Sequence, residues 1–593
     1  MESIIQKRIS SLREFMKAHH LNAFIVPNTD PHLSEYIAPH WKCRQWISGF
    51  TGSAGTIVVT ETKAGLWTDS RYFLQAAQQL KDTGIDLFKE ALSETPSITA
   101  WLCSTLQTND CVGVYGELFS VSSIETIQTE LAQHNIRLNT EFDPFASLWT
   151  DRPSIPDSPA YIHRLEYAGC PTTDKIERIR KAIAENHAEA ILLSALDEIA
   201  WVLNLRGNDI KCNPLVVSYL VVSQKDITYF INPEKVTPEV AAYLQGIGVH
   251  TMRYNQLGEY LSTCNFKSLQ LMPSTTNYGA FSAVAPTCQI IRANSPVALM
   301  KAMKNEQEIK GVYKAMIRDG IALVRFLRWL EEVIPTGQET ELSITKKLYD
   351  LRATQDNFKG ESFDTITGYK EHAAIVHYSA TPETDVHIRP KGLLLVDSGA
   401  QYFESTTDIT RTIAVGPITE EEKYDYTAVL KGHIDLALCQ FPKGTRGAQI
   451  DILARQALWN AGMNYLHGTG HGVGSFLNVH EGPQSIRMNE NPVCLELGML
   501  MSNEPGVYKS DRHGIRTENL MLIRQGQETE FGTFYRFETV TLCPIDKTPI
   551  LTSMLTADEK NWLNAYHQQV YDKLSPYLTA EENQWLKEKT SAI

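Results

Sequence analysis

Short apolar runs alternate with amphipathic helical segments over the first half of the chain. The runs AFIV at 23–26 and TIVVT at 56–60 have the length and β-branched content of buried strands. Residues 4–16 place isoleucine, leucine and methionine at helical spacing among charged residues, which predicts an amphipathic helix and not the apolar core of a signal peptide. Strands that alternate with helices predict an α/β layer fold.

This pattern stops at a proline-rich linker and then begins again. The linker, DRPSIPDSP at 151–159, holds three prolines, which disfavour both helix and central strand. Beyond it, AEAILLS and LNLRGND repeat the order of LNAFIVP and ISGFTG, in which a short apolar strand precedes an apolar or aromatic run and a glycine turn. We therefore predict two α/β domains of similar fold, at residues 1–158 and 159–300.

A well-marked helix start opens the third predicted domain, residues 301–593. Asn305 is the expected N-cap, and Glu308 stands three residues later, where it completes a capping box. Apolar residues then follow on one helical stripe as far as Leu330. Further helices are predicted near 421–439 and 447–461, between strands, and in the C-terminal tail.

Composition places the chain among globular proteins and excludes several classes. At 593 residues it is long enough for about three or four domains. A net charge of −14 argues against nucleic-acid binding, and no apolar run reaches the ~20 residues of a membrane span. The ten cysteines include no C-x-x-C pair, which favours reduced thiols and a cytoplasmic location.

Five side chains of the metal-binding types stand at predicted element ends or on shared strand faces in the last domain. The buried strand LLLV leads to an aspartate, and the β-run 498–503 leads to a glutamate before Pro-Gly. The period-two patterns of 406–415 and 515–523 each present one more carboxylate, and the glycine-rich turn HGTGHGVG supplies an imidazole. The candidate ligands are Asp397, Asp408, His471, Glu504 and Glu518.

Four carboxylates and one imidazole form an oxygen-rich donor set. Such a set suits two divalent cations, Mn²⁺ first and Co²⁺ or Zn²⁺ next. Each residue alone has an ordinary explanation, since an aspartate at a strand end is usually a turn former and a strand glutamate usually faces solvent. Together they indicate metal, because carboxylates on segments rich in Leu, Ile and Val are costly to bury without a cation.

The same residues carry a resemblance to a known family. The runs VDSGAQY, TTDITRT, HGTGHGVGSFLNVHEGP, NEPGVY and GIRTEN resemble the motifs of the pita-bread metallopeptidases, and most closely those of the long, three-domain cytosolic Xaa-Pro aminopeptidases (aminopeptidase P). GFTGSAG, WTDSRYFLQA and ALDEIAWVLNLRGNDIKCNPL extend the resemblance over nearly the whole chain. It implies an α/β (α+β) protein with two creatinase-type N-terminal domains and a C-terminal pita-bread catalytic domain.

The resemblance also implies how the metals are held and used. Asp397 would bind one ion, His471 and Glu504 the other, and Asp408 and Glu518 would bridge both. A water between two such ions, its pKa lowered to about 7, would attack the peptide bond. The implied substrates are peptides with proline at the second position, and the implied assembly is a homodimer.

Three further histidines stand near these motifs, at His377, His467 and His480. Imidazole titrates near neutral pH and can stabilise an oxyanion or pass a proton to a departing nitrogen. By resemblance all three are catalytic, and His377 and His480 also contact substrate. Arg71, in TDSRYFLQA, matches a substrate-contacting position, in its own site or in a partner's. Singly, each histidine would more often be structural, and Arg71 could equally be a surface ion-pair partner.

Two alternatives stay open from the sequence. A prolidase, which is a dipeptidase acting on Xaa-Pro, has the same metal site, and the two enzymes differ in whether Xaa-Pro or Xaa-Pro-Yaa is preferred. A pita-bread domain can also serve as a non-catalytic peptide-binding module. Retention of all five candidate ligands argues against that module, because the pita-bread domains of the histone-chaperone family have lost their ligands.

Overall fold

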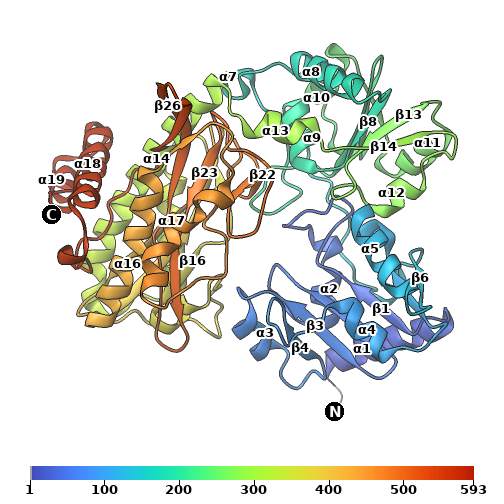
Figure 1. The fold of residues 1–593 in the computed structure, drawn as a ribbon, viewed down its shortest axis with the longest axis horizontal. Helices are drawn as coiled ribbons and strands as arrows, with labels where there is room; N and C mark the ends of the chain where they lie inside the picture. Colours follow the sequence, from blue (N-terminus) through green and yellow to red (C-terminus); the bar gives the residue numbers. More distant parts are fainter. Residues whose placement is uncertain (1–2) are drawn as a thin grey trace. The chain divides into compact units, whose positions relative to one another are not determined.

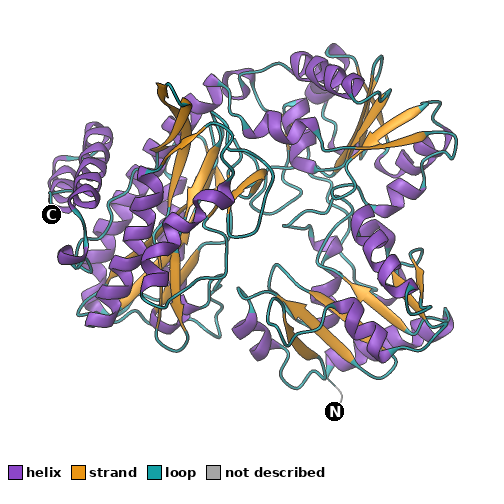
Figure 2. Ribbon diagram, viewed as in Figure 1, coloured by secondary structure: helices purple, strands orange, loops and turns teal. Residues whose placement is uncertain are grey.

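The structure is a computed structural model that describes residues 3–593. The chain divides into two compact units. Unit 1 is the chain up to His163 together with Cys170–Val297, and unit 2 is Arg164–Gly169 together with Ala298–Ile593. Both units combine helices and strands (Figures 1 and 2). The predicted boundary at residue 158 lies inside unit 1, so the division into three domains stays a prediction.

Unit 1 contains two six-stranded sheets of the same topology. Their strand orders are β4-β3-β2-β1-β5-β6 and β12-β11-β10-β8-β13-β14. In each sheet the corresponding central strand, β1 or β8, pairs antiparallel on one side and parallel on the other. This match confirms the repeat that the sequence predicts.

The strands of unit 1 follow the predicted apolar runs. All four residues of β1 are buried, and the opening helix α1 buries Ile5, Ile9, Leu12 and Met16 against the sheet core. The strands are β1 (Ala23–Val26), β2 (Thr56–Thr60), β3 (Ala64–Thr68), β4 (Asp86–Lys89), β5 (Cys111–Val114), β6 (Arg137–Asn139), β7 (Tyr161–Ile162), β8 (Ala190–Leu193), β9 (Leu205–Arg206), β10 (Ser218–Ser223), β11 (Ile227–Ile231), β12 (Val249–Met252), β13 (Ser268–Leu271) and β14 (Gln289–Arg292). The helices are α1 (Ile4–Ala18), α2 (Cys43–Ser48), α3 (Phe73–Gln79), α4 (Ile98–Thr105), α5 (Val121–Ala132), α6 (Phe145–Leu148), α8 (Thr172–Glu185), α9 (Leu196–Leu203), α10 (Pro238–Gly246), α11 (Leu257–Thr263) and α12 (Tyr278–Ser282).

Unit 2 packs long helices against several small sheets (Figure 2). A three-stranded sheet has the order β16-β17-β19, and a six-stranded sheet has the order β20-β27-β26-β23-β21-β22. The strands are β15 (Phe358–Glu361), β16 (Ile366–Tyr369), β17 (Leu393–Ser398), β18 (Ala400–Tyr402), β19 (Ile409–Ala414), β20 (Gln440–Pro442), β21 (Gly470–Gly472), β22 (Glu481–Ile486), β23 (Leu500–Asn503), β24 (Gly506–Lys509), β25 (His513–Arg516), β26 (Asn519–Thr529) and β27 (Gly532–Thr539). The helices are α7 (Leu165–Ala168), α13 (Pro296–Ala302, which begins in unit 1), α14 (Glu306–Val333), α15 (Glu341–Ala353), α16 (Glu420–Leu438), α17 (Gly447–Asn460), α18 (Ala557–Leu574) and α19 (Ala580–Lys589).

Helix α14 begins where the capping box predicts. The Asn305 side chain accepts from the backbone N–H groups of Gln307 and Glu308, and the Glu308 carboxylate accepts from the Asn305 N–H at 2.9 Å. Its apolar stripe packs against α16 and the strands that carry the site, within one core. Within residues 3–593, no helix combines the length and apolar character needed to cross a membrane.

Candidate metal centre

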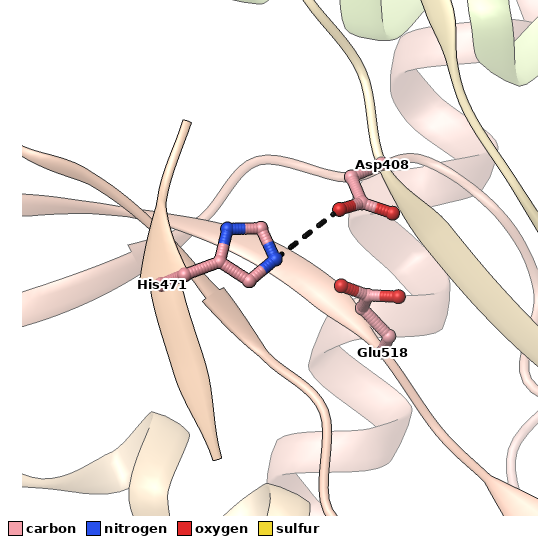
Figure 3. Close-up of side chains that lie close together, drawn as sticks. All are labelled: Asp408, His471 and Glu518. Atoms are coloured by element: carbon pink, nitrogen blue, oxygen red, sulfur yellow. Dashed lines mark ion pairs between the residues drawn. The ribbon is translucent and has the colours of Figure 1, made fainter. Parts of the chain in front are cut away.

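Three of the predicted ligands point toward a common centre in unit 2. Figure 3 shows the Asp408 and Glu518 carboxylates facing the His471 ring, and one ligand atom from each of the three lies within 4.8 Å of the others. His471 Nε2 is 3.5 Å from an Asp408 oxygen and 3.4 Å from Glu504 Oε1. The fifth residue, Asp397, acts electrostatically on Glu504 and Glu518 and is itself affected by Asp408. All five candidate ligands thus gather in one place.

Pairing between strands brings the carboxylates together. Asp397 lies in β17 directly opposite Thr410 of β19, and Asp408 stands just before β19. The Glu518 N–H donates to the Thr410 carbonyl oxygen at 3.1 Å, and the Thr410 hydroxyl donates to Glu518 Oε2 at 2.8 Å. Thr410 therefore fixes the backbone and the side chain of Glu518 against the strand that follows Asp408.

A second set of hydrogen bonds orients His471. Its backbone N–H donates to the Ser502 hydroxyl at 3.0 Å, and that hydroxyl lies 3.2 Å from Glu504 Oε1. Nδ1 lies 2.8 Å from the Gly472 carbonyl oxygen, so Nδ1 carries a proton there. In the neutral ring Nε2, which faces the carboxylates, is then the free acceptor and the atom available to a metal.

Electrostatics in this cluster reflect four carboxylates crowded into a buried space. Burial, with added repulsion from Asp408 and Asp397, raises the pKa of Glu504 to about 7. Burial and the neighbouring carboxylates also raise the pKa of Glu518 well above its ordinary value, and burial raises that of Asp397. Burial opposes a charged His471 ring, but Asp408 and Glu504 outweigh it and raise the pKa of that histidine to about 9. A bound cation would favour charged carboxylates and a neutral imidazole, which is the opposite of the protonation states that these pKa shifts favour.

Two carboxylate oxygens at this centre fit the presence of metal. Asp397 Oδ1 and Glu518 Oε1 are buried and accept no hydrogen bond from the residues that the structure describes. An unpaired carboxylate oxygen in a protein interior is costly, whereas coordination to a divalent cation satisfies it. With the imidazole Nε2 and the remaining carboxylate oxygens, they form a donor set suited to hard or borderline divalent cations.

The local structure differs from the sequence prediction in two places. His471 lies in a three-residue strand, β21, and not in a turn. The single strand predicted at 515–523 is two strands, β25 and β26, and Glu518 lies in the break between them. The break arises because the chain changes partners there: β25 pairs with β24, whereas β26 pairs with β23 and β27.

The three additional histidines of the prediction also lie in unit 2. The His480 ring packs edge-on against His471, with 4.4 Å between ring centroids. His467 Nε2 lies 2.9 Å from the Tyr508 hydroxyl, and its Nδ1 lies 2.7 Å from the Gly468 carbonyl oxygen. His377 follows Val376, whose carbonyl oxygen is 3.5 Å from the Arg516 guanidinium.

Arg516 and Tyr508 join the cluster although the sequence prediction gave them no role. Arg516 Nη2 donates to Asp397 Oδ2 at 2.5 Å, and Nη1 donates to the Tyr508 hydroxyl at 2.7 Å. Because that hydroxyl also reaches His467, a continuous chain of hydrogen bonds links a candidate ligand to a candidate catalytic histidine. The motif GIRTEN places Arg516 two residues before Glu518, but that spacing does not indicate its partner Asp397, 119 residues earlier in the chain.

Arg71 lies in unit 1, whereas the candidate ligands belong to unit 2. Its guanidinium makes a two-pronged ion pair with Asp69, at 2.9 and 2.7 Å, and is about one quarter exposed. Burial lowers the pKa of this arginine, but the Asp69 carboxylate outweighs that effect and raises it. The contact fixes the direction of the side chain within unit 1, and a substrate contact stays a prediction.

Comparison with family models covers most of the chain. Residues 8–144 and 151–308 each match the Creatinase/Prolidase N-terminal domain. Residues 310–525 match metallopeptidase family M24, and residues 533–593 match the C-terminal region of peptidase M24. The matches agree with the repeated sheets of unit 1 and with the metal-binding donor set of unit 2.

Similar proteins align with the chain from end to end. Xaa-Pro aminopeptidase 1 of Dictyostelium discoideum is 39% identical, with 99% of this chain and 97% of that protein covered. Aminopeptidase P2 of Arabidopsis thaliana is 38% identical over all of this chain and 89% of its own length. The crystal structure of X-prolyl aminopeptidase from Caenorhabditis elegans, described as a cytosolic enzyme with a di-nuclear active site, superposes with a TM-score of 0.95 at 32% identity and covers 99% of this chain and 100% of its own. The chain therefore belongs to the Xaa-Pro aminopeptidase (aminopeptidase P) family of M24 metallopeptidases.

Proposed function

We propose that the protein is a metal-dependent aminopeptidase that hydrolyses the bond between the first residue of a peptide and a proline at the second position. The convergence of four carboxylates and His471 on one buried centre carries this proposal. Relatives that match the whole chain are Xaa-Pro aminopeptidases, and one of them has a di-nuclear active site.

The five side chains are assigned to two divalent cations. Asp397 would hold one ion, His471 and Glu504 the other, and Asp408 and Glu518 would be shared between them. The oxygen-rich donors favour Mn²⁺, with Co²⁺ and Zn²⁺ as the next choices. When bound, two such cations lower the pKa of a water to about 7, which provides hydroxide at neutral pH.

Histidines near this centre handle the remaining proton and charge movements. We assign His480, whose ring contacts that of His471, to donate a hydrogen bond to the scissile carbonyl oxygen as negative charge develops on it. His467 is bonded at both ring nitrogens, so it reaches substrate only after it releases Tyr508. His377 is assigned to substrate contact and to the proton that the prolyl nitrogen takes on leaving.

The position of proline explains the need for a dedicated peptidase. An Xaa-Pro bond is a tertiary amide without an N–H, and its ring fixes φ, so a peptidase that aligns its substrate through that donor cannot use it. A free α-amine that reaches the metal centre would limit cleavage to the first residue. We also assign Arg71 to substrate contact, from its own subunit or from the partner in a homodimer.

The three-domain division at residues 158 and 300, the homodimer and a cytoplasmic location belong to the same proposal. The family models break near these boundaries, between residues 144 and 151 and between 308 and 310. The C. elegans relative is described as cytosolic, which supports the location.

Turnover of matched peptides tests the proposed function. The protein loaded with Mn²⁺ is expected to release the first residue of Xaa-Pro-Yaa at least tenfold faster, in kcat/KM, than it cleaves Xaa-Pro, a difference of about 1.4 kcal/mol in transition-state stabilisation. Xaa-Ala-Yaa serves as the control for the proline requirement. A preference for the dipeptide would identify a prolidase, and the absence of any metal-dependent release would identify a binding module.

A further inference from the structure

Glu481 is a buried carboxylate held by two lysines. Its side chain has no exposed surface, and those of Lys301 and Lys304 are 2% and 0% exposed. Lys301 Nζ donates to Glu481 Oε2 at 2.6 Å, and Lys304 Nζ donates to Oε1. Each carboxylate oxygen therefore has its own ammonium partner, inside the protein and away from solvent.

The two lysines come from the segment that leads into helix α14. Lys301 belongs to the last turn of α13, and Lys304 stands two residues before α14 begins. The Lys304 ammonium also donates to the Lys301 carbonyl oxygen at 3.1 Å, and the Lys304 backbone N–H donates to the Gly498 carbonyl oxygen at 3.1 Å. Both lysines are thus anchored by backbone bonds, and they form a fixed support for the carboxylate.

Glu481 adjoins the two chain segments that carry His480 and His471. It directly follows His480, and in the β21–β22 pair it stands opposite Gly472, the residue after His471. The backbones approach so closely there that a side chain at Gly472 would collide with the Glu481 carbonyl oxygen. A shift of Glu481 would therefore move the strand end that carries His480 relative to the one that carries His471.

Burying three charged side chains together has a large desolvation cost. Apolar residues of the same volume often give equal or greater stability, so the group indicates a directional role that apolar packing cannot supply. We infer that Glu481, held by Lys301 and Lys304, is a positioning residue that fixes the His480 ring beside His471. This inference rests on the proposed function, in which His480 contacts the substrate.

Two variants of the metal-loaded enzyme separate positioning from stability. Lys304→Met removes one partner and leaves Glu481 with one, so we expect a lower Tm. The combined variant Glu481→Met, Lys301→Met and Lys304→Met removes all three charges, and we expect its Tm to return to near that of the wild type. In both variants kcat for an Xaa-Pro-Yaa peptide is expected to fall about 100-fold, with KM changed less than about threefold, because misplacement by about 1 Å suffices for such a loss. The control is Lys310→Met, at an exposed position of α14, which should leave Tm, kcat and KM unchanged.

Crystal structures of the two variants supply a readout that does not depend on turnover. The ring-centroid separation of His471 and His480, 4.4 Å in the wild type, is expected to change by about 1 Å or more. An unchanged separation, or a combined variant with wild-type kcat, would overturn the inference. If the wild-type enzyme itself cleaves no Xaa-Pro-Yaa peptide, the proposed function fails, and the ring separation alone decides the role of Glu481.

Discussion

Removal of the cations is expected to change how the stability of unit 2 responds to pH. In the metal-free protein, burial and neighbouring carboxylates raise the pKa of Glu504 from 4.5 to about 7. The folded state then prefers the protonated acid. The contribution of Glu504 to the free energy of unfolding is therefore fully present below pH 4.5 and is lost as pH rises through 7. With metal bound this pH dependence reverses, because the charged carboxylates are the ligands and metal affinity rises with pH.

The size of the effect follows from the pKa of Glu504 in the two states. A folded value of about 7 against an unfolded value of 4.5 corresponds to about 3 kcal/mol when the acid is fully protonated. About 2 kcal/mol of that is lost between pH 5.5 and pH 8. In the loaded protein, a free metal concentration of 100 times Kd would add about 2.7 kcal/mol.

Urea unfolding of chelator-treated protein measures this loss. Wild type and Glu504→Gln are compared at pH 5.5 and pH 8, with hydrogen exchange of β23 as the report on unit 2. Glu504 also raises the pKa of His471 and of Glu518, so the losses from these two groups over the same pH range are no larger in the variant. The wild type should therefore lose at least about 2 kcal/mol more than the variant between the two pH values. Glu528→Gln, at an exposed position of β26, is the matched control and should behave as the wild type. Equal losses in wild type and Glu504→Gln would refute the assignment of a repelled, buried carboxylate.

Three further predictions concern single side chains. Tyr508→Phe removes the hydroxyl that accepts a hydrogen bond from Arg516 and lies within hydrogen-bond distance of His467. In steady-state assays kcat should fall about tenfold, or about 1.4 kcal/mol, with a small change in KM. An unchanged kcat would show that this chain of hydrogen bonds does not contribute to catalysis. Burial lowers the pKa of His567 to about 3, so its contribution to stability is present above pH 6.5 and is lost as pH falls. Between pH 8 and pH 5 the wild type should therefore lose about 2 kcal/mol more unfolding free energy than His567→Asn, measured by urea unfolding. Identical losses in the two proteins would contradict the assigned burial effect. Asp408→Ala and His471→Ala should abolish hydrolysis and keep the wild-type circular dichroism spectrum, because the sheets of unit 1 do not include the site; global unfolding of both variants would count against a local role.

Sequence reasoning succeeded where one local signal decides the structure. The AFIV run gives β1 at residues 23–26, and the Asn305–Glu308 capping box gives the start of α14. It failed where tertiary pairing overrides the local pattern. The period-two run at 515–523 predicts one strand, but the chain exchanges β24 for β23 as its partner, and Glu518 lies at the change.

The candidate site shows the same division. Residue type and motif resemblance singled out the five ligands, because oxygen-rich donors have few other uses on apolar segments. The support of Glu481 by Lys301 and Lys304 could not be predicted, since about 180 residues separate the partners and no local pattern encodes so distant a contact. The bond from Arg516 to Asp397 was missed for the same reason.

Titration of the metal-free protein with Mn²⁺ in the presence of an Xaa-Pro-Yaa peptide tests the central claim most directly. Bound metal per chain is measured by mass spectrometry under native conditions, and release of the first residue is measured in the same samples. Release is expected to rise with loading and to level off at two ions per chain, because the five ligands would hold two cations. Full occupancy without release of the first residue, or release that is unaffected by the chelator, would contradict the account.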